Sequence, residues 1–329
     1  MLRRSFVAAA AAVMAMMPAT APAQAEDYPV NRLTIVVPFN PGGSADRMAR
    51  AVASFLPEEL GGIPVTVVNR PGGSGTLGHT WFLQQPDDGS FAMVSPANPY
   101  LISNVLRSDG RLDWDAFHFV NGQWQDYYVL FVNNEQPFQT ADELMDYIVE
   151  NPGVASAAVI AGDGGHLSTL ILLEQLGLPG DAVNFITYDG GGPMRTAIAG
   201  NQVTFSITAA LGSDVIANQV RPLAVFQAEP RPEWDAPLIN DILEARGLEV
   251  PIIAADLRTF TVHRSFYETH PDRYEMLVDA YRRTLERDDF RRFIAASAID
   301  GMWMGPEATQ ASLNESFEIF SQYIDILQD

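Results

Sequence analysis

The sequence predicts an α/β protein of two lobes, with mainly parallel sheets and a ligand cleft between the lobes. Short apolar runs typical of buried strands alternate with amphipathic helical stretches along the chain. The same alternation restarts after Tyr127, which indicates a second α/β unit. Glycine-rich loops follow several predicted strands, at the sheet edge where open α/β sheets bind ligands.

The first unit has the pattern of a βαβαβ succession. Strands are expected where apolar residues run together, and helices where apolar residues recur on one face. The expected strands are 33–39, 65–68 and 91–95, and the expected helices are 45–60 and 75–85. Helical connections between successive strands predict a parallel sheet with right-handed crossovers.

The second unit repeats this pattern and is followed by a helical C-terminus. Thr140 and Glu143 have the spacing of a capping box, so a helix is expected to begin at Thr140. A second helix is expected over 167–176. The expected strands are 128–132, 154–160, 183–188, 203–207, 223–226 and 259–263. Two long helices, 272–297 and 306–327, are expected to close the chain.

Residues 1–25 have the order of a secretory signal peptide. Arg3 and Arg4 precede the apolar run 6–17, and small residues follow at Ala23 and Ala25. The run is too short to cross a bilayer core of about 30 Å. We therefore expect cleavage near residue 26 and secretion into the periplasm, through either the general or the twin-arginine route.

Composition excludes several classes of site and partner. The net charge is −21, and all basic residues are arginines, so nucleic acid and anionic membranes are not expected as partners. Cysteine is absent, which removes disulfides and cysteine-based metal or redox sites. An anionic ligand would have to be held by short-range donors, because the long-range field of the chain repels it.

Four glycine-rich loops each follow a strand and open a helix. They are 41–46, 71–76, 162–166 and 189–193. Glycine allows a close approach of the backbone to a ligand, and a helix N-terminus offers about four unpaired N–H groups. Several such ends around one cleft would bind a carboxylate without lysine.

These loops and their flanking strands resemble the Bug/TctC family of extracytoplasmic receptors. The resemblance is carried by LTIVVPF before PGGSAD in 33–46, by VNRPGGSG in 68–75, by the loop around His166, and by YDGGGP in 188–193. It continues through AGNQV in 199–203 and RPLAV in 221–225, so it covers nearly the whole chain after the signal peptide.

The resemblance implies a type II periplasmic-binding-protein fold and a transport role. Residues 26–126 and 227–329 would form lobe 1, and residues 127–226 an inserted lobe 2. A small organic carboxylate would bind between the lobes and pass to the membrane permease subunits of a tripartite tricarboxylate-type transporter. The implied ligand-binding residues are Phe39, Asn40, Gly43, Ser44, Asp46, Ser74, Gly75, Thr76, Asp163, Gly164, Gly165, His166 and Asp189.

Three of these positions depart from the family pattern. Asn40 stands where a small residue is usual, Asp163 where Ser or Thr is common, and Asp189 where a basic residue is common. A carboxylate beside a bound carboxylate is unfavourable unless it meets a donor. Either the ligand has an amine or hydroxyls opposite Asp163 or Asp189, or Asp163 only caps its helix.

Other residues also keep two interpretations. Asp46 either compensates its helix dipole or makes a hydrogen bond that closes the lobes. Ser44 and Ser74 either cap helices or contact ligand, and His166 is either a ligand donor or a structural histidine. The aromatic residues Trp124, Tyr127 and Tyr128 form either a cleft wall or hinge packing.

The sequence favours a binding protein over an enzyme. Residues 73–78 match G-x-G-x-x-G, but the acidic residue of a dinucleotide site does not follow at the required distance. The chain also lacks a hydrolase elbow, a zinc-spaced histidine pair and the lysine of a P-loop. We expect no cofactor or metal, and a monomer. A periplasmic sensor that presents a carboxylate to a membrane histidine kinase is the alternative function.

Overall fold

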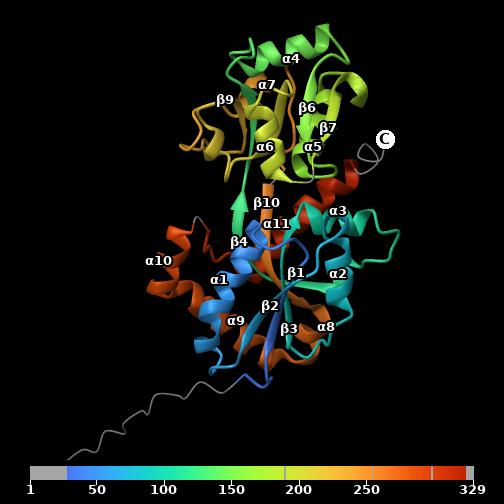
Figure 1. Cartoon of the computed structure of the whole chain (residues 1–329). Coiled ribbons are helices and arrows are strands. Elements are labelled where there is room, and N and C mark those ends of the chain that lie inside the picture. Colours follow the sequence, from blue (N-terminus) through green and yellow to red (C-terminus); the bar gives the residue numbers. More distant parts are fainter. Residues whose placement is uncertain (1–27, 189, 254, 298, 324–329) are drawn as a thin grey trace, which may run out of the picture.

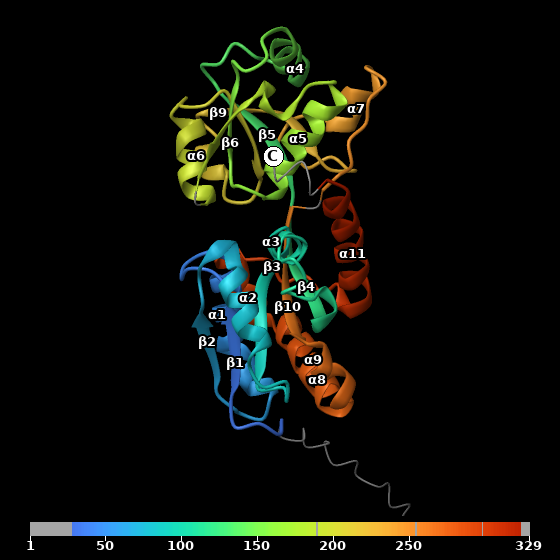
Figure 2. The same ribbon diagram turned by 90° about the vertical axis from the view of Figure 1, so that its right-hand side faces the viewer.

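The computed structural model describes residues 28–188, 190–253, 255–297 and 299–323. The expected signal peptide therefore lies outside the described residues. Two α/β lobes are stacked along one axis and connected by strands that run between them (Figures 1 and 2). Within the described part of the chain, no helix is both long and apolar enough to cross a membrane.

The first lobe contains a five-stranded sheet in the order β2-β1-β3-β10-β4. β1 is parallel to both β2 and β3, whereas β10 is antiparallel to both β3 and β4. All five residues of β1 are buried, as expected of a strand covered on both faces. The strands are β1 (Leu33–Val37), β2 (Val65–Asn69), β3 (Phe91–Asn98), β4 (Phe117–Asp126) and β10 (Ala255–His263).

Helices cover this sheet on both sides (Figure 1). One group packs around α1 and includes the C-terminal helices α9 and α10, and its apolar residues form one core. The helices of the lobe are α1 (Ser44–Glu59), α2 (Thr76–Leu83), α3 (Tyr100–Leu106), α8 (Arg264–Thr269), α9 (Pro271–Glu286), α10 (Asp288–Ala296) and α11 (Gly305–Tyr323). Two 3-10 turns are η1 (Gly73–Gly75) and η2 (Trp114–Ala116).

The second lobe has its own five-stranded sheet, in the order β7-β6-β8-β5-β9. β6 is parallel to β7 and β8, and β5 is antiparallel to β8 and β9. The strands are β5 (Tyr128–Asn133), β6 (Ser156–Val159), β7 (Asn184–Thr187), β8 (Phe205–Ala209) and β9 (Val220–Phe226). The helices are α4 (Ala141–Glu150), α5 (Gly164–Gln175), α6 (Gly191–Ala199) and α7 (Ile239–Glu244), with 3-10 turns η3 (Gly180–Ala182) and η4 (Asp214–Ile216).

Both sheets are mixed because the chain crosses twice between the lobes. β4 ends at Asp126 and β5 begins at Tyr128, so a single residue makes the first crossing. The second crossing leads into β10, which lies inside the first sheet. Each crossing strand runs against its neighbours, which explains the antiparallel pairs beside the expected parallel ones.

The segment after β9 stays in contact with the second lobe. Val225 bridges to Leu238 in parallel, and Arg246 forms ion pairs of 2.6 and 2.8 Å with Asp142 and Asp146 of α4. We therefore propose that lobe 2 continues to about residue 253, beyond the boundary expected at residue 226, and that lobe 1 resumes with β10.

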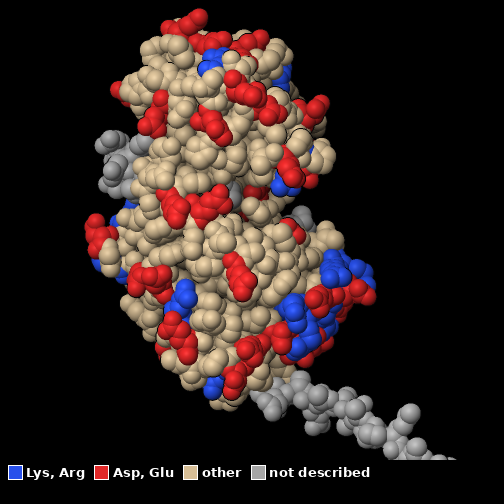
Figure 3. Space-filling model, turned by 180° about the vertical axis from the view of Figure 1, so that it is seen from behind, with Lys and Arg blue, Asp and Glu red and all other residues tan. Residues whose placement is uncertain are grey.

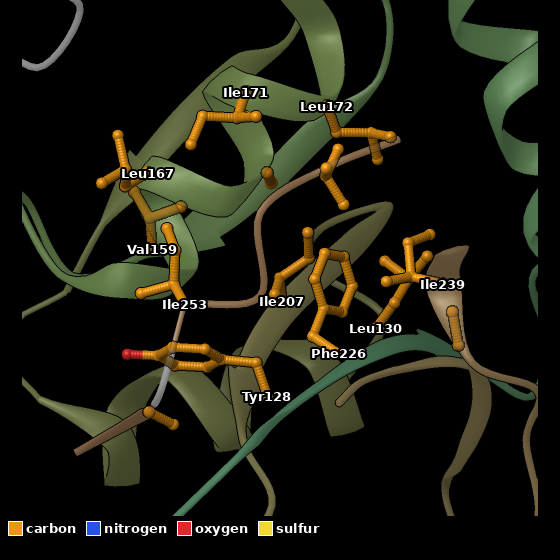
Figure 4. Close-up of a cluster of buried hydrophobic side chains, with 14 of the residues drawn as sticks. Tyr128, Leu130, Val159, Leu167, Ile171, Leu172, Ile207, Phe226, Ile239 and Ile253 are labelled. Atoms are coloured by element: carbon orange, nitrogen blue, oxygen red, sulfur yellow. The ribbon is translucent and has the colours of Figure 1, made fainter. Parts of the chain in front are cut away.

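One apolar core extends from lobe 2 across the crossings into lobe 1. It includes Leu130, Phe226 and Ile253 above the crossings, and Leu257 and Leu313 below them. Figure 4 shows the lobe 2 part of this cluster, with the ring of Tyr128 at its rim and the hydroxyl pointing away from the aliphatic side chains. Burial of this surface holds the bases of the two lobes together.

The expectation of a single helix over 272–297 is wrong. The helix stops at Arg287, whose backbone is extended (φ −62°, ψ 134°), and α10 begins with Asp288. Arg287 donates from Nε and Nη2 to the carboxylate of Asp289 at 2.9 and 2.8 Å. A second N-terminus with two acidic residues in its first turn is thereby created, an arrangement that the helix dipole stabilises.

Helix α11 is fastened to β4 by a buried hydroxyl. The N–H of Gly122 donates to Oγ1 of Thr309 at 2.7 Å, and that hydroxyl donates to the carbonyl of Gly305 at 2.7 Å. Thr309 is fully buried. Since Gly122 lies four residues before the end of β4, α11 braces the strand that forms the first crossing.

Replacing Thr309 by Val should destabilise the protein. The isosteric side chain leaves the N–H of Gly122 buried without an acceptor, which costs about 1–3 kcal/mol. Thermal unfolding should show a fall of about 2–4 °C for each kcal/mol. The control Thr309→Ser keeps the hydroxyl and should lose less; equal losses in the two variants would contradict this role of the hydroxyl.

Candidate ligand-binding site between the lobes

The loops that follow strands in the two lobes meet where the lobes face each other (Figure 2). Oγ of Ser103, in α3 of lobe 1, donates to the carbonyl of Gly162 in lobe 2 at 3.0 Å. The N–H of Leu211, after β8, donates to Oδ1 of Asp126 at the first crossing at 3.1 Å. The carboxyl ends of parallel strands from both sheets therefore border one region, the usual position of a ligand in α/β folds.

Asp46 organises the first glycine-rich loop. Its Oδ2 accepts the N–H of Gly42 at 2.8 Å and Nε of Arg50 at 2.9 Å, and its Oδ1 accepts Nδ2 of Asn69 at 2.9 Å. Asn69 also donates to the carbonyl of Phe39 at 3.0 Å. Burial opposes ionisation, but the bonds from Arg50, Gly42 and Asn69 keep the pKa of Asp46 below its ordinary value. Both oxygens are thus engaged in fixing this loop to the end of β2.

Ser44 brings the start of α1 into contact with a buried arginine. Its Oγ accepts Nε of Arg258 at 2.7 Å, and Nη2 of Arg258 forms an ion pair of 3.0 Å with Asp256. The guanidinium also lies 4.4 Å from the ring centre of Trp124. Gly43 is the N-cap of α1, and as a glycine it offers no side chain to accept the N–H groups of the first turn. An anion at this helix N-terminus would therefore meet a guanidinium as well as backbone N–H groups.

Asp256 and Arg258 were not among the site residues expected from the sequence. Arg258 is only 4% exposed, although it is a charged residue inside β10. Residues two apart in a strand share a face, so two opposite charges at this spacing within one strand were the signal that could have identified them.

The second glycine-rich loop, 71–76, contains a strained turn that is linked to a buried histidine through Asn104. Ser74 has φ 50°, and its carbonyl accepts Nδ2 of Asn104 at 3.0 Å. Asn104 also contacts Nδ1 of His79 at 3.1 Å, and Nε2 of His79 lies 2.8 Å from Oγ of Ser95. Burial lowers the pKa of His79 to about 3, so the ring is neutral and serves as a fixed link from β3 to the loop.

Gly75 and Thr76 are used mainly for the geometry of this loop. Gly75 has φ 96°, and a Cβ there would lie 3.1 Å from the ring of Phe39. Oγ1 of Thr76 donates to the carbonyl of Gly73 at 2.7 Å. Ser74 is exposed, and its hydroxyl has no hydrogen bond with any described residue.

Asp163 caps α5 and is buried where the lobes meet. Its Oδ1 accepts the N–H of His166 at 2.8 Å, and the side chain is only 5% exposed. Burial raises the pKa of Asp163 to about 8, against the effect of the backbone bonds, and the nearby carboxylate of Asp256 raises it further. Asp163 therefore caps α5, as expected. Its buried position disfavours the ionised form of its carboxyl group.

Gly164, Gly165 and His166 are packed into lobe 2. A Cβ on Gly164 would lie 2.6 Å from the hydroxyl of Tyr128, and one on Gly165 would lie 2.1 Å from the carbonyl of Ile207. These glycines allow the helix to approach β5 and β8 closely. Nδ1 of His166 accepts the N–H of Gly162 at 3.2 Å, and burial lowers the pKa of the ring to about 4.

Asp126 lies at the first crossing and was also missed. It is 2% exposed, and its Oδ1 accepts the N–H groups of Tyr127 and Leu211. Its Oδ2 is buried without a hydrogen-bond partner among the described residues. Burial raises the pKa of Asp126 to about 6, and Arg258 opposes that shift.

For two of the expected site residues, Asn40 and Asp189, the structure gives no contact at the site. Asn40 is exposed in the first loop. Asp189 lies outside the described residues. From the same loop region, Arg195 of α6 donates to Oγ of Ser213 at 2.9 Å and to the carbonyl of Leu211 at 2.8 Å. Arg195 thus supports the loop after β8, which the sequence did not predict.

Other regions offer less chemistry. A surface hollow of about 420 Å³ lies between residues 28–31 and 61–64, at the amino ends of β1 and β2, with no charged residue in its lining. No group of three or more acidic or histidine side chains suited to a metal ion occurs among the described residues. The interface between the lobes is therefore the best candidate site.

Comparisons with known proteins find relatives along most of the chain. The family model described as tripartite tricarboxylate transporter family receptor matches residues 48–317. Protein BugT of Bordetella pertussis is 29% identical over 214 residues, which cover 64% of this chain and 64% of BugT. A UPF0065 protein of Cupriavidus necator is 23% identical over 312 residues, which cover 93% of this chain and 90% of that protein.

Solved structures share the two-lobed fold. The structure titled R. palustris Rpa4515 with adipate has a TM-score of 0.70 at 25% identity, and covers 92% of this chain and 99% of its own. MatC from Rhodopseudomonas palustris with bound malate has a TM-score of 0.67 at 20% identity, and covers 91% and 99%. The periplasmic binding protein BugD has a TM-score of 0.69 at 21% identity, and covers 90% and 97%. The last two likenesses concern the fold alone.

Asp163→Asn should remove a pH-dependent loss of stability. Between about pH 4 and pH 8, the unfolded chain releases the proton of Asp163 and the folded protein keeps it, so stability falls as the pH rises. The fall approaches about 1.4 kcal/mol for each pH unit within this window. Asparagine caps equally well without titrating. The stability of the variant relative to the parent should therefore rise from pH 5 to pH 7 in urea unfolding.

The matched control is Asp113→Asn. Asp113 caps η2 by accepting the N–H of Asp115 at 3.0 Å, but it is exposed. Its variant should follow the parent at every pH. A constant difference between the parent and Asp163→Asn across pH 5 to 7 would contradict the raised pKa of Asp163.

Proposed function

Since this chain belongs to the tripartite tricarboxylate transporter receptor family, we propose that it is a periplasmic solute-binding protein for a small organic carboxylate. It would capture the ligand between its lobes and deliver it to the membrane subunits of a tripartite transporter. It would act by binding alone, as a monomer and without a cofactor.

One observation carries the proposal. The N-termini of α1 and α5, from different lobes, both open onto the region where the lobes meet, and a buried guanidinium lies at the first of them. Unpaired N–H groups and the helix dipole favour an anionic group at the N-terminus of α1, whereas at α5 the carboxyl of Asp163 already takes this position. A carboxylate at the N-terminus of α1 would lie beside the guanidinium of Arg258, which is paired with Asp256.

Relatives support the ligand class. The titles of two structures with this fold name adipate and malate as bound molecules. Both are small carboxylates, and one of the two proteins is 25% identical to this chain over nearly its whole length. The acidic surface, visible on both lobes in Figure 3, gives no long-range attraction for such a ligand, so recognition would depend on the local donors.

The fold also suggests how the ligand would be enclosed. The lobes are joined by one residue at the first crossing and by the start of β10 at the second. Rotation about these short segments would separate Ser103 from Gly162 and open the region between the lobes. A ligand that contacts both lobes would favour the closed form by its differential affinity for it.

A thermal-shift screen of the purified protein against small carboxylates tests the proposal. The protein is first unfolded and refolded to remove any ligand carried from the host. A ligand at 100 times its Kd adds about 2.7 kcal/mol, which corresponds to a rise of roughly 5–10 °C. The screen should find such a ligand, and chromatography of the mixture should recover it unchanged.

Two outcomes would contradict the proposal. One is the absence of any shift across mono-, di- and tricarboxylates, and the other is consumption of the ligand. The transport role is tested separately, by ligand uptake in cells that express the protein with the membrane subunits. Binding without any effect on uptake would favour the sensor function instead.

A further inference from the structure

The region between the lobes holds more buried carboxyl groups than guanidinium groups. Asp126, Asp163 and Asp256 meet there with Arg195 and Arg258. The three acidic residues, called here the aspartate cluster, come from the first crossing, from the cap of α5 and from the start of β10. If all are ionised, one negative charge is left without a counter-charge.

Asp256 lies close to the other two carboxyl groups. Its charge raises the pKa of both Asp126 and Asp163. The hydroxyl of Tyr128 lies beside Gly164, and the charges of all three cluster carboxyls act on it. Three residues that are distant in sequence therefore lie near one another and near the hydroxyl of Tyr128.

The two arginines do not satisfy this cluster. Arg258 uses Nε on Ser44 and both terminal nitrogens on Asp256, at 3.2 Å to its carbonyl and 3.0 Å to its carboxylate. Arg195 donates to Ser213 and to backbone carbonyls, and forms no ion pair with a described residue. Neither arginine therefore forms an ion pair with Asp126 or Asp163.

One carboxylate oxygen of the cluster lacks a donor among the described residues. Oδ2 of Asp126 is buried and unpartnered, in a residue that is 2% exposed. The carboxylate of Asp163, which is 5% exposed, accepts only backbone N–H groups, those of His166 and Gly165. Buried polar atoms are rarely left unpaired in native proteins, so Oδ2 of Asp126 points to a donor that a ligand brings.

We propose that the aspartate cluster is an ammonium subsite, and that the ligand is an aminocarboxylate. Its carboxylate would lie at the N-terminus of α1 beside Ser44 and Arg258, and its protonated amine against Asp163, Asp256 and Asp126. This inference rests on the proposed function, because it assumes that a carboxylate binds between the lobes.

An ammonium group fits the cluster better than a hydroxyl group does. A hydroxyl brings one donor and no charge, whereas an ammonium brings three donors and a positive charge that balances the cluster once Asp163 ionises. The side chain of Asp256 is 19% exposed, so the cluster is open to a ligand that enters between the lobes. The Asp256–Arg258 pair joins this subsite to the carboxylate position at Ser44.

Binding of the amine should be coupled to release of a proton. Without ligand, Asp163 keeps its proton in neutral solution because its carboxyl is buried beside Asp256. An ammonium group would favour the ionised form and expel the proton. The groups that face Asp163 from the packed elements are Tyr100 of α3, Tyr128 of β5, Asp256 of β10 and His166 of α5, with Arg107 near its loop.

Calorimetry with matched ligands tests the subsite. Each set shares one skeleton and differs only at carbon 2: aspartate, malate and succinate; glutamate, 2-hydroxyglutarate and glutarate; phenylalanine, phenyllactate and phenylpropionate. In at least one set, the amino acid should bind at least about tenfold more tightly than both analogues. Its binding should release close to one proton at pH 7, measured in buffers of different ionisation enthalpy.

The variant Asp163→Asn keeps the helix cap and removes the charge. The preference for the amino acid should fall to less than about threefold, and the proton release should disappear, while the unsubstituted acid keeps its affinity. Asp113→Asn, the matched capping variant outside the cluster, should retain both the preference and the proton release. Urea unfolding establishes that each variant is folded.

The outcomes separate this inference from the proposed function. If an unsubstituted or hydroxy acid binds at least as tightly as the amino acid in every set that binds, the ammonium subsite is wrong and the binding function stands. The same holds if Asp163→Asn leaves the amino preference intact. If no member of any set binds, the proposed carboxylate function fails, and this inference fails with it.

Discussion

The ion pair between Arg258 and Asp256 is the interaction on which the arrangement between the lobes depends. It lies at the start of β10, where the chain returns to lobe 1, and it also holds Ser44 at the start of α1. A buried pair of this kind contributes little net stability, but removal of one partner costs about 3–5 kcal/mol because the other charge stays buried. Its position therefore fixes two chain segments that are 214 residues apart in sequence.

The rest of the site follows from the way the chain crosses between the lobes. β5 and β10 each begin at a crossing and run through the middle part of a sheet, so residues at their starts are held by strand pairing on both sides. Rotation at the crossings can change the distance between the glycine-rich loops while the apolar core that spans the crossings keeps the bases of the lobes together. Asp126 and Asp256, which lie at the crossings, would stay near the rotation axis, while Ser44 and Asp163 lie on the loops that move.

Local signals in the sequence were sufficient for most elements. The apolar runs identified nine of the strands near their observed positions. Thr140 caps its helix as expected, since it accepts the N–H of Glu143 at 3.2 Å, while the carboxylate of Glu143 accepts the N–H of Gln139 instead of that of Thr140. The missed strand, β4, contains Asn121, Gln123 and other polar residues whose hydrogen-bond partners lie in the distant C-terminal segment. No local pattern shows that these side chains are buried.

The site was harder to predict than the fold, because its charges meet only in three dimensions. The glycine-rich loops could be recognised in the sequence. Several of their polar side chains, however, form hydrogen bonds that hold the loops in shape, as those of Asp46 and Thr76 do. Asp126 ends β4 and Asp256 lies at the start of β10, with no motif around either. Only the folded chain brings Asp256 near both Asp126 and Asp163. Sequence alone could identify the third member of the cluster, since Asp163 interrupts a glycine-rich loop.

The capping role of Asp163 does not by itself account for an aspartate at this position. Serine, threonine and asparagine cap helices about as well, and none of them has to be protonated or charged inside the protein. Burial and Asp256 both disfavour the carboxylate of Asp163, so the residue lowers stability at neutral pH relative to an equally good neutral cap. A group that costs stability where neutral replacements would cap as well is best explained by a ligand that uses its charge. The carboxyl group of Asp163 would then stay protonated in the free protein and ionise when the ammonium group of a ligand binds beside it.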